Sequence, residues 1–421
     1  MTIDFEGSIW QLELPDEYGI PPKKMSASTL NEIESCPRKY ALRRANYPKV
    51  WKKYGYPPNP SLKALQGIIL HGAIEDIITA LKQANCPSVF DETFVKTMRS
   101  LNGFAGVLEN QLQKISNEVA ENPRLNHKTD QLIGKLRDAF PLIREQLQAQ
   151  ICKLKLGDRT NSKSVSAYKQ GNHSLSNGVH SELELNADDL KWHGKVDYLH
   201  LSPNGCEIAD FKSGERKLEH IFQIKIYNLL WILDKERNPN AIPVTKLWLS
   251  YRNEEIEIPP LANGEIESFI DEVKQRTEAA KNQISQPVPI ARPSSDNCRY
   301  CSVRQLCSTF WTQETQRILE MEKTASFSIG KKNSFDIEIE LEDSIAEHIW
   351  NARTLTCGSL EPETQLLVRF APTLLHIPIS LKPGLKLRLL NVSSLAPMDE
   401  ETLANSILTN WQSESFIISK Y

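Results

Sequence analysis

Apolar residues recur along the chain with two different periods, and the period changes near residue 179. Residues 62–153 repeat apolar side chains every three or four positions, which is typical of amphipathic helices. After residue 179 the period falls to two, which predicts strands, and later segments return to a helical period. We therefore expect strands at 180–186, 192–201, 206–211 and 245–251, and helices at 218–234 and 265–285.

The segment before residue 62 is mixed. Alternation of apolar and acidic residues over 3–14 predicts one or two short strands. Residues 26–42 predict a helix with Ser28 or Thr29 as its N-cap, which Pro37 kinks or restarts.

Two other segments differ in character. The polar stretch 156–179 predicts a mobile loop. After about residue 324, short strand candidates separated by turn signals predict a separate small β-domain. The strand candidates in that β-domain are 335–341, 365–370, 374–379 and 385–392.

Composition sets broad limits. A chain of 421 residues is expected to form two or three units, and 40% hydrophobic with 24% charged residues describes an ordinary soluble protein. A net charge of −3 neither supports nor refutes nucleic-acid binding, which needs only a local basic surface. We expect no membrane partner, because no run of 18 apolar residues occurs. The N-terminus lacks a signal-peptide pattern, so the expected location is cytoplasmic.

The main chemical motif spans two predicted strands, as Gly194-Lys-Val-Asp197 and Asp210-Phe-Lys212. Asp210 and Lys212 are two apart, so both side chains project from one face of their strand. A hairpin through the Pro203-Asn-Gly turn brings Asp197 beside Asp210. Two such close carboxylates need a cation between them, and Mg²⁺ or Mn²⁺ suits oxygen ligands. Taken alone, an Asp-x-Lys triplet is more often a cross-strand salt bridge.

With Gly194 before them and Gly214 after them, Asp197, Asp210 and Lys212 resemble the PD-(D/E)xK nuclease superfamily. More narrowly they are similar to its RecB-type exonuclease branch, which includes CRISPR-associated and AddB-type nucleases. The resemblance implies an α/β, restriction-endonuclease-like core, in which helices flank a mixed central sheet. Here that core would carry a helical insertion and a C-terminal small β-barrel, for which an OB-like fold is one candidate. The expected units are a nuclease domain over 1–311, with its helical part at 62–153, and a β-domain over 324–421.

The same resemblance extends to three further residues. Gly67-Ile-Ile-Leu-His71 matches the histidine motif of the branch and implies that His71 is a metal ligand. Gln223 and Tyr227 match its motif on the following helix and imply an active-site role beside the lysine. By itself, His71 would more often be an ordinary helix histidine with a local hydrogen bond, and Tyr227 could equally be a half-buried core residue.

An acidic residue on the preceding strand often assists the metal in related enzymes. Glu182 and Glu184 share one strand face, so either could serve. For at least one of them, a solvated strand face is the more common situation.

Cysteines form a second constellation. Cys298-Arg-Tyr-Cys301 and Cys307 offer three thiolates, and Cys36 is a candidate fourth. This arrangement resembles the iron–sulfur nucleases of the same branch, which implies a [4Fe–4S] cluster that closes the nuclease domain. A Zn²⁺ ion is the alternative, because zinc also accepts four thiolates. The remaining cysteines are expected to be buried thiols: Cys86, Cys152, Cys206 and Cys357.

Cations and aromatic rings alternate over residues 38–56, a pattern typical of single-strand binding. The DNA-binding candidates at its start are Arg38, Lys39, Tyr40, Arg43 and Arg44. The alternative is a solvated helix and loop with scattered aromatic residues. The C-terminal β-domain is expected to bind nucleic acid or a protein.

Together these features predict a Mg²⁺- or Mn²⁺-dependent deoxyribonuclease, an exonuclease acting on single-stranded DNA or duplex ends. Its expected setting is DNA repair or recombination, or anti-phage or CRISPR-type defence. No ATPase motif occurs, so any helicase or defence-complex protein would be a separate partner. The alternative is a non-catalytic DNA-end-binding scaffold subunit.

Overall fold

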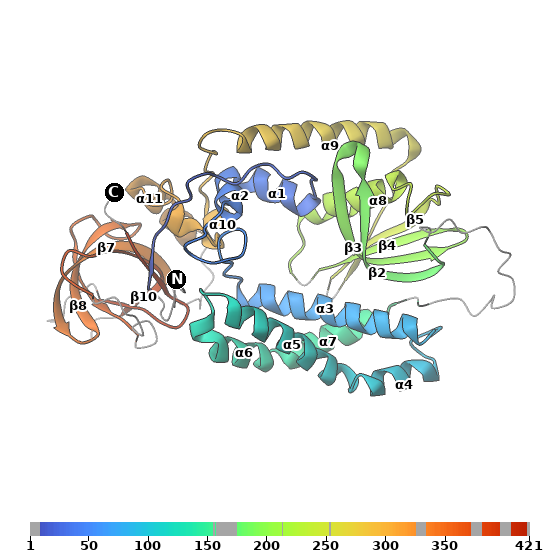
Figure 1. The fold of residues 1–421 in the computed structure, drawn as a ribbon, viewed down its shortest axis with the longest axis horizontal. Helices are drawn as coiled ribbons and strands as arrows, with labels where there is room; N and C mark the ends of the chain where they lie inside the picture. Colours follow the sequence, from blue (N-terminus) through green and yellow to red (C-terminus); the bar gives the residue numbers. More distant parts are fainter. Residues whose placement is uncertain are drawn as a thin grey trace.

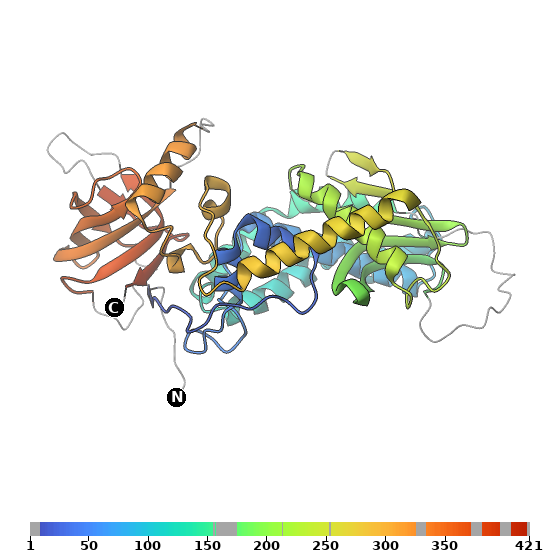
Figure 2. The same ribbon diagram turned by 90° about the horizontal axis from the view of Figure 1, so that it is seen from above.

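The structure is a computed structural model that describes residues 9–154, 156, 175–212, 214–251, 254–325, 334–371, 381–395 and 406–418. A sheet with helices on both faces forms one end of the molecule, and a β-barrel forms the other (Figure 1). Seen from above, the molecule is elongated and the helices lie between these two ends (Figure 2). The expected mixed sheet, helical insertion and C-terminal small barrel are therefore confirmed.

The central sheet has the strand order β2-β3-β4-β5-β6. Its first three strands are antiparallel because tight turns join them, whereas β4 and β5 are parallel because a helix crosses over between them. The strands are β2 (Gly178–Ala187), β3 (Trp192–Ser202), β4 (Gly205–Phe211), β5 (Val244–Ser250) and β6 (Glu255–Ile258), and the crossover helix is α8 (Leu218–Leu233). Strand β6 was not expected from the sequence.

The two faces of the sheet bury different helices. One face packs against α1 (Ala27–Ser35), α8 and α9 (Asn263–Ile284), and the other against a layer of five helices (Figure 1). Strand alternation sets this division: Ile208 joins the first core and the adjacent Ala209 joins the second. The layer consists of α3 (Leu62–Gln83), α4 (Glu92–Ser100), α5 (Gly103–Glu121), α6 (Thr129–Asp138) and α7 (Phe140–Ile151).

Helix α3 is long and apolar enough to cross a membrane by length and composition alone. Half of its apolar window is buried inside the protein, as it is in the core helix of a soluble domain.

The predicted helix over 26–42 is broken at Cys36 into α1 and α2 (Pro37–Arg44). Pro37 starts the second helix, where its missing N–H costs nothing, and Cys36 keeps an extended backbone between the two. The predicted N-caps were wrong. Ser26 caps α1, because its extended backbone lets its hydroxyl accept the N–H of Thr29.

The barrel closes through five strands in the order β7-β8-β9-β11-β10 and back to β7. That order is typical of a five-stranded Greek-key barrel of the OB type. Two further strands, β12 and then β1, extend it beside β10. Hence the first described strand of the chain lies in the sheet of the C-terminal domain. The strands are β7 (Ser334–Ala346), β8 (Ile349–Cys357), β9 (Gln365–Arg369), β10 (Lys386–Leu395), β11 (Ser406–Leu408), β12 (Glu414–Ile417) and β1 (Ile9–Gln11).

Several expectations for this region differ from the structure or lie beyond what it describes. Strands β8, β11 and β12 and the helix α11 (Gln313–Ala325) were not predicted. The predicted strand at 374–379, most of the predicted loop at 156–179 and the first residues of the predicted N-terminal strand lie outside the described residues.

A buried ion pair joins the barrel to the helical layer. Arg124, which follows α5, donates hydrogen bonds from Nε and Nη2 to the two carboxylate oxygens of Glu414 on β12, both at 2.8 Å. Its Nη1 donates to the carbonyls of Pro57 at 2.9 Å and Ser302 at 2.7 Å. The guanidinium also lies 5.2 Å from the centre of the Tyr56 ring. Three separate chain segments therefore meet on this side chain, which is 1% exposed.

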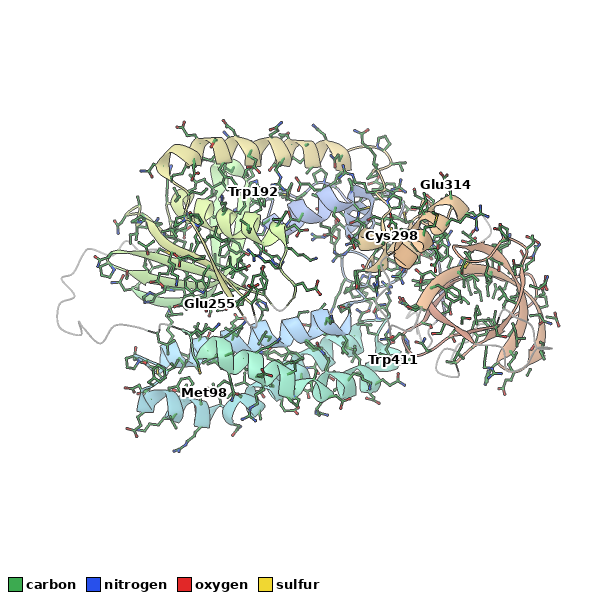
Figure 3. The ribbon with its side chains drawn as sticks, turned by 180° about the vertical axis from the view of Figure 1, so that it is seen from behind. Met98, Trp192, Glu255, Cys298, Glu314 and Trp411 are labelled. Atoms are coloured by element: carbon green, nitrogen blue, oxygen red, sulfur yellow. The ribbon has the colours of Figure 1, made fainter. Side chains whose placement is uncertain are left out.

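Two further arginines hold the segment around Ser302 to the barrel. Arg304 donates from Nε to Asp336 on β7 at 2.6 Å. Arg388 on β10 donates to Glu338 at 2.9 Å and to the carbonyl of Gln305 at 2.6 Å. As a result, the segment of Cys298, Cys301 and Cys307 is hydrogen-bonded to Arg124 on one side and to the barrel on the other. In Figure 3, Cys298 lies at this junction between the helices and the barrel.

Replacing Glu414 by Gln is expected to lower the free energy of unfolding by about 3–5 kcal/mol, because it leaves the buried Arg124 charge without its counterion. Urea unfolding measures this change. The matched control is Glu361→Gln, whose Arg317 partner is half exposed and whose loss should cost less than about 1 kcal/mol. Equal, small changes in both variants would contradict the assignment of Glu414.

Acid should weaken the same joint. Burial alone would raise the pKa of Glu414, but the charge and hydrogen bonds of Arg124 outweigh it and lower that pKa to about 2. Since the folded pKa lies below the ordinary value of 4.5, the contribution is fully present above pH 4.5 and is lost as the pH falls towards 2. Unfolding measured across this window should be steeper in pH for the wild type than for Glu414→Gln. Identical slopes would show that another group controls acid stability.

Candidate active site

Strand register brings the two predicted carboxylates together. The ladder that pairs Tyr198 with Ala209 sets Asp197 on β3 opposite Asp210 on β4 at the next position. The N–H of Phe211 donates to Asp197 Oδ2 at 2.7 Å, so the Asp197 side chain takes a main-chain donor of the neighbouring strand. The side-by-side arrangement predicted from strand alternation is therefore present in the structure.

Asp210 is the more deeply buried of the two and lacks sufficient positive charge around it. Its side chain is 2% exposed, and Lys212 Nζ lies 2.5 Å from its Oδ2. Lys212 therefore forms a short ion pair with that oxygen. Burial and then the charge of Asp197 raise the pKa of Asp210 well above its usual range, although Lys212 and His71 oppose this. Two buried carboxylates side by side favour a cation between them.

His71 reaches the same place from α3, where its Nδ1 lies 3.6 Å from Asp197 Oδ2. Burial alone would raise the pKa of Asp197, but the nearby imidazole of His71 lowers it overall. Burial likewise acts to lower the pKa of His71, but Asp197 and then Asp210 raise it. His71 and Asp197 thus each favour the charged form of the other.

Of the two acidic residues on β2, the structure brings only Glu182 to the site. Its carboxylate, with His71 and Asp197, offers three ligand atoms within 4.8 Å of one another. Glu182 lies opposite Asp197 in the β2–β3 register, in a left-handed backbone conformation at φ 51°, and pairs with Lys195 at 2.6 Å. The side chain of Glu184 is 63% exposed. The spacing of the two acids could not separate them, whereas the strand register does.

A chain of hydrogen bonds fixes the lysine. Lys212 Nζ donates to Gln223 Oε1 at 2.8 Å, and Gln223 Nε2 donates to the Tyr227 hydroxyl at 2.7 Å. Both partners lie on one face of α8, as predicted. Burial, Asp210 and Asp197 raise the pKa of Tyr227 well above its usual value, so its hydroxyl stays neutral. Lys212 is thereby held towards Asp210 by two uncharged groups.

Close packing explains the first motif glycine. A Cβ on Gly194 would lie 2.8 Å from Leu230 Cδ1 and 2.9 Å from Tyr227 Cε1. Only glycine therefore lets β3 approach α8 closely enough to bring Tyr227 over the carboxylates. The second motif glycine, Gly214, has open space around it.

Sequence reasoning missed His220 and Tyr251. His220 Nδ1 lies 2.8 Å from the Tyr251 hydroxyl, beside Lys212 at the carboxyl ends of the parallel strands β4 and β5. Burial and the Lys212 charge lower the pKa of His220 to about 4, so it is neutral at physiological pH. Helical spacing offered a signal, because His220 lies three residues before Gln223 and shares its face.

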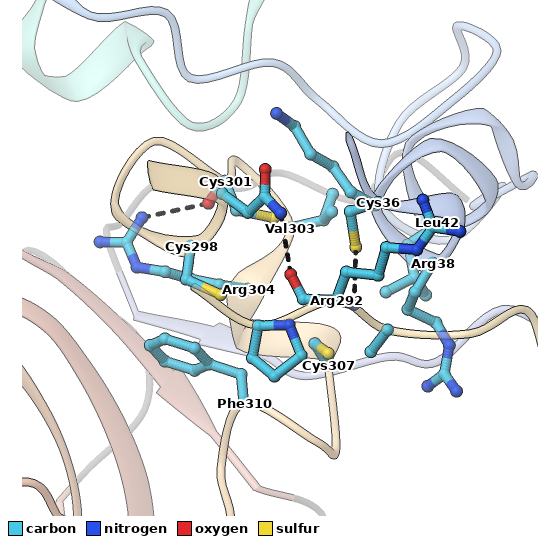
Figure 4. A pocket seen from close by; sticks show the side chains of 14 residues that line it. Cys36, Arg38, Leu42, Arg292, Cys298, Cys301, Val303, Arg304, Cys307 and Phe310 are labelled. Carbon is cyan, nitrogen blue, oxygen red and sulfur yellow. Dashed lines mark hydrogen bonds between the residues drawn. The ribbon is translucent and has the colours of Figure 1, made fainter. Parts of the chain in front are cut away.

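The four cysteines predicted to act together line one pocket, although Cys36 is more than 260 residues from the others (Figure 4). The N–H of Arg292 donates to Cys36 Sγ at 3.5 Å, and Arg38, Lys39 and Arg304 also line the pocket. Burial and, to a smaller extent, the neighbouring thiols raise the pKa of Cys298 to about 12. Thiols brought together in this way are set up for a ligand that draws off their protons. Of the other cysteines, Cys86, Cys206 and Cys357 are buried as predicted, but Cys152 is exposed, so that part of the prediction was wrong.

Of the five predicted DNA-binding residues, two are buried and three are partly exposed. Tyr40 is buried in the main core, and Arg38 is buried with its Nε donating to the Pro289 carbonyl at 2.6 Å. Neither offers a free surface to DNA, because both pack against segments that follow much later in the chain. Arg43 pairs with Glu32, and Arg44 lies 5.2 Å from the Tyr40 ring. Arg43, Arg44 and Lys39 are partly exposed, and their contact with DNA stays a prediction.

One histidine, three carboxylates and a lysine therefore converge where β3 and β4 run side by side between α3 and α8. Mainly oxygen ligands with one imidazole suit a hard divalent ion such as Mg²⁺ or Mn²⁺. The comparison with curated proteins gave no match. A family model of the PD-(D/E)XK nuclease superfamily matches residues 24–308, which include every residue of this site and all four clustered cysteines. The chain belongs to the PD-(D/E)XK nuclease superfamily.

Proposed function

We propose that the protein is a metal-dependent deoxyribonuclease that hydrolyses phosphodiester bonds with His71, Asp197 and Asp210 as ligands of Mg²⁺ or Mn²⁺. The observation that carries this proposal is the convergence of His71, Glu182 and Asp197, whose ligand atoms lie within 4.8 Å of one another beside the buried pair of Asp210 and Lys212. A divalent ion bound there would polarise a phosphate and help ionise a water molecule. Glu182 is placed to add a further carboxylate beside His71 and Asp197.

The protein groups around the ion would orient and stabilise. Lys212 places a positive charge where negative charge develops on the phosphorus centre. Gln223 and Tyr227 keep that lysine in position without adding charge, since each is neutral and hydrogen-bonded to the next group. The deep burial of Asp210 keeps water from screening these charges.

We further infer an exonuclease that acts on single-stranded DNA or duplex ends, in the cytoplasm, in repair, recombination or anti-phage defence. Support comes from the resemblance of the His71, Gln223 and Tyr227 motifs to the RecB-type branch. The alternative is a non-catalytic scaffold that binds DNA ends, although the complete hydrogen-bonded Lys212, Gln223 and Tyr227 set favours an enzyme.

Replacing Asp210 by Asn is expected to reduce cleavage of labelled single-stranded DNA by about a hundred-fold or more with Mg²⁺ or Mn²⁺, because it removes a ligand and a charge of the site. The control is Asp188→Asn, an exposed aspartate outside the site. Cleavage by the wild type that Asp210→Asn leaves unchanged would contradict the assignment of the site. No cleavage by the wild type would favour the scaffold alternative.

Thermal unfolding separates metal binding from catalysis. In a chelator, Asp210→Asn should be more stable than the wild type at neutral pH, because a buried carboxylate whose pKa is raised destabilises the fold when charged. Adding Mn²⁺ should then stabilise the wild type more than the variant.

We also propose that Cys36, Cys298, Cys301 and Cys307 hold a [4Fe–4S] cluster. A tetrahedral zinc site with Zn–S bonds of about 2.3 Å brings its sulfurs to about 3.8 Å from one another. Among the described residues, no three of these thiols have sulfurs within 4.8 Å of one another. This wider arrangement suits a cluster of several metal atoms better than a single ion. The cationic residues Arg38, Lys39 and Arg304 around the pocket suit its negative charge.

Anaerobically purified protein is expected to be brown, to show the broad visible absorption of thiolate-bound iron–sulfur and to contain equal amounts of iron and sulfide. Cys298→Ala should lose the colour and much of the thermal stability, since the cluster ties α2 to the segment after α9. The matched control is Cys152→Ala, whose thiol is exposed and lies outside the pocket. Colourless wild-type protein with stoichiometric zinc would overturn the cluster in favour of zinc.

For the barrel, one observation favours protein docking over nucleic-acid binding. OB-type barrels bind oligonucleotides on the face of their second and third strands, here β8 and β9. The aromatic residue of these two strands, Trp350, is buried, and the Arg353 guanidinium pairs with Glu340 and Glu363. Within its described strands this face therefore offers no exposed ring, its Arg353 is engaged by two acids, and its exposed cation is Arg369. We infer that it binds a protein.

A further inference from the structure

The loop between α2 and α3 has an unusual composition. Residues 45–61 contain three lysines and four aromatic residues but no aspartate or glutamate. In a chain with 53 acidic residues among 421, a stretch of this length would be expected to carry about two. The loop lies between the helices of the active-site unit and the barrel (Figure 1).

Both ends of the loop are fixed in the core. Tyr47 and Tyr56 are buried and pack edge to face with ring centres 4.8 Å apart. The Tyr47 hydroxyl donates to the Leu42 carbonyl at 2.6 Å, and the Tyr56 N–H donates to the Arg43 carbonyl at 3.0 Å. Gly55, at φ 85°, allows this close return, since a Cβ there would lie 2.7 Å from the Arg43 oxygen. The loop is therefore built to hold one shape.

Between these anchors the loop presents rings and cations to solvent. Tyr54 is 67% exposed, and Trp51 is half-buried with its Nε1 donating to the Gly55 carbonyl at 2.5 Å. Lys52 is exposed, and no ion pair engages it within the described part of the chain. Lys49 and Lys53 have acidic neighbours, Glu13 at 4.0 Å and Glu121 at 2.7 Å, but their side chains are 76% and 57% exposed.

We propose that the tip formed by Lys49, Trp51, Lys52 and Tyr54 is a binding platform for single-stranded nucleic acid, with bases stacking on Tyr54 and phosphates on the lysines. One exposed ring and one half-buried ring beside cations, in a loop whose own sequence has no acidic residue, match a polyanion that carries unpaired bases. A duplex keeps its bases stacked inside and cannot use the ring of Tyr54 in this way.

This inference rests on the proposed nuclease function and adds where the substrate strand is held. The loop ends at Ser61, the N-cap of α3, and His71 lies ten residues further along that helix. At 1.5 Å per residue the rise from Ser61 to His71 is about 15 Å, so the loop leads directly into the helix that brings His71 to the metal site. A strand held at the tip would continue along α3 towards that site. Arg38 and Tyr40 precede this loop and have buried side chains, so they are not part of the platform.

The test is binding of a labelled single-stranded oligonucleotide in a chelator, measured by fluorescence anisotropy without cleavage. Tyr54→Ala should weaken binding between about five-fold and a hundred-fold, whereas Tyr54→Phe should keep the affinity because its ring remains. Lys52→Ala should lower the slope of log affinity against log salt by about 1. The matched controls are Phe90→Ala, which removes an exposed ring just before α4, and Lys274→Ala, which removes an exposed lysine on α9. Thermal unfolding confirms that each variant folds.

Cleavage by the wild type with Mn²⁺ is measured in parallel. If the wild type cleaves but Tyr54→Ala and Lys52→Ala bind like the wild type, the platform is overturned while the nuclease function stands. An equal loss of affinity in Phe90→Ala and Tyr54→Ala would also overturn the platform. So would a Tyr54→Ala variant that loses affinity equally for duplex and for single-stranded DNA. If the wild type neither cleaves nor binds, the proposed function fails and the platform fails with it.

Discussion

The buried pair of Arg124 and Glu414 is the contact on which the arrangement of the whole molecule depends. Taking two charges out of water costs several kcal/mol per ion, and their mutual attraction offsets this only when every donor is satisfied. Here the guanidinium meets the carboxylate through two hydrogen bonds and gives its remaining donors to the carbonyls of Pro57 and Ser302. Those carbonyls belong to the loop before α3 and to the cysteine segment. The geometry of one side chain therefore sets the positions of the barrel, the helical layer and the cysteines together.

A second constraint acts at the active site. Unlike the Arg124–Glu414 pair, it lowers the stability of the fold. Asp197 and Asp210 face each other in a buried place where charge is costly, and Lys212 and His71 supply only part of the compensation. Buried charge that is only partly compensated in this way lowers the stability of the fold. Beside it, Gly194 lets β3 approach α8 closely, and Glu182 has a left-handed backbone.

Much of this site could be predicted from sequence, because strand and helix periods are local. Two residues of separation place Asp210 and Lys212 on one face, and four place Gln223 and Tyr227 on one face of α8. Motif resemblance added His71 and the remote Cys36. What could not be predicted depends on distant partners. The burial of Arg38 requires the Pro289 carbonyl, 251 residues away, and the choice of Glu182 over Glu184 requires the register of β2 on β3.

The barrel was harder to predict for a related reason. Its short strands carry little periodic signal, and β11 and β12 have only three and four residues. Such strands are stabilised by their neighbours in the closed ring and not by their own sequence. Strand β1 is the extreme case, because three residues near the N-terminus pair with β12 at the other end of the chain. The turn signals predicted a small barrel, but they did not predict which strands belong to it.

One short stretch of chain, residues 36–71, connects the cysteine pocket, the anchored loop and the active site. From Cys36 to His71 the chain provides a cysteine of the four-cysteine pocket, the helix α2, the anchored loop and the first turns of α3. The loop returns to α2 through the Arg43 carbonyl, and Cys36 lies directly before that helix. Order at the cysteine pocket therefore fixes α2, α2 fixes the loop, and the loop fixes where α3 begins. Since α3 brings His71 to Asp197, the cysteine pocket and the active site are joined through consecutive, hydrogen-bonded elements rather than through direct contact.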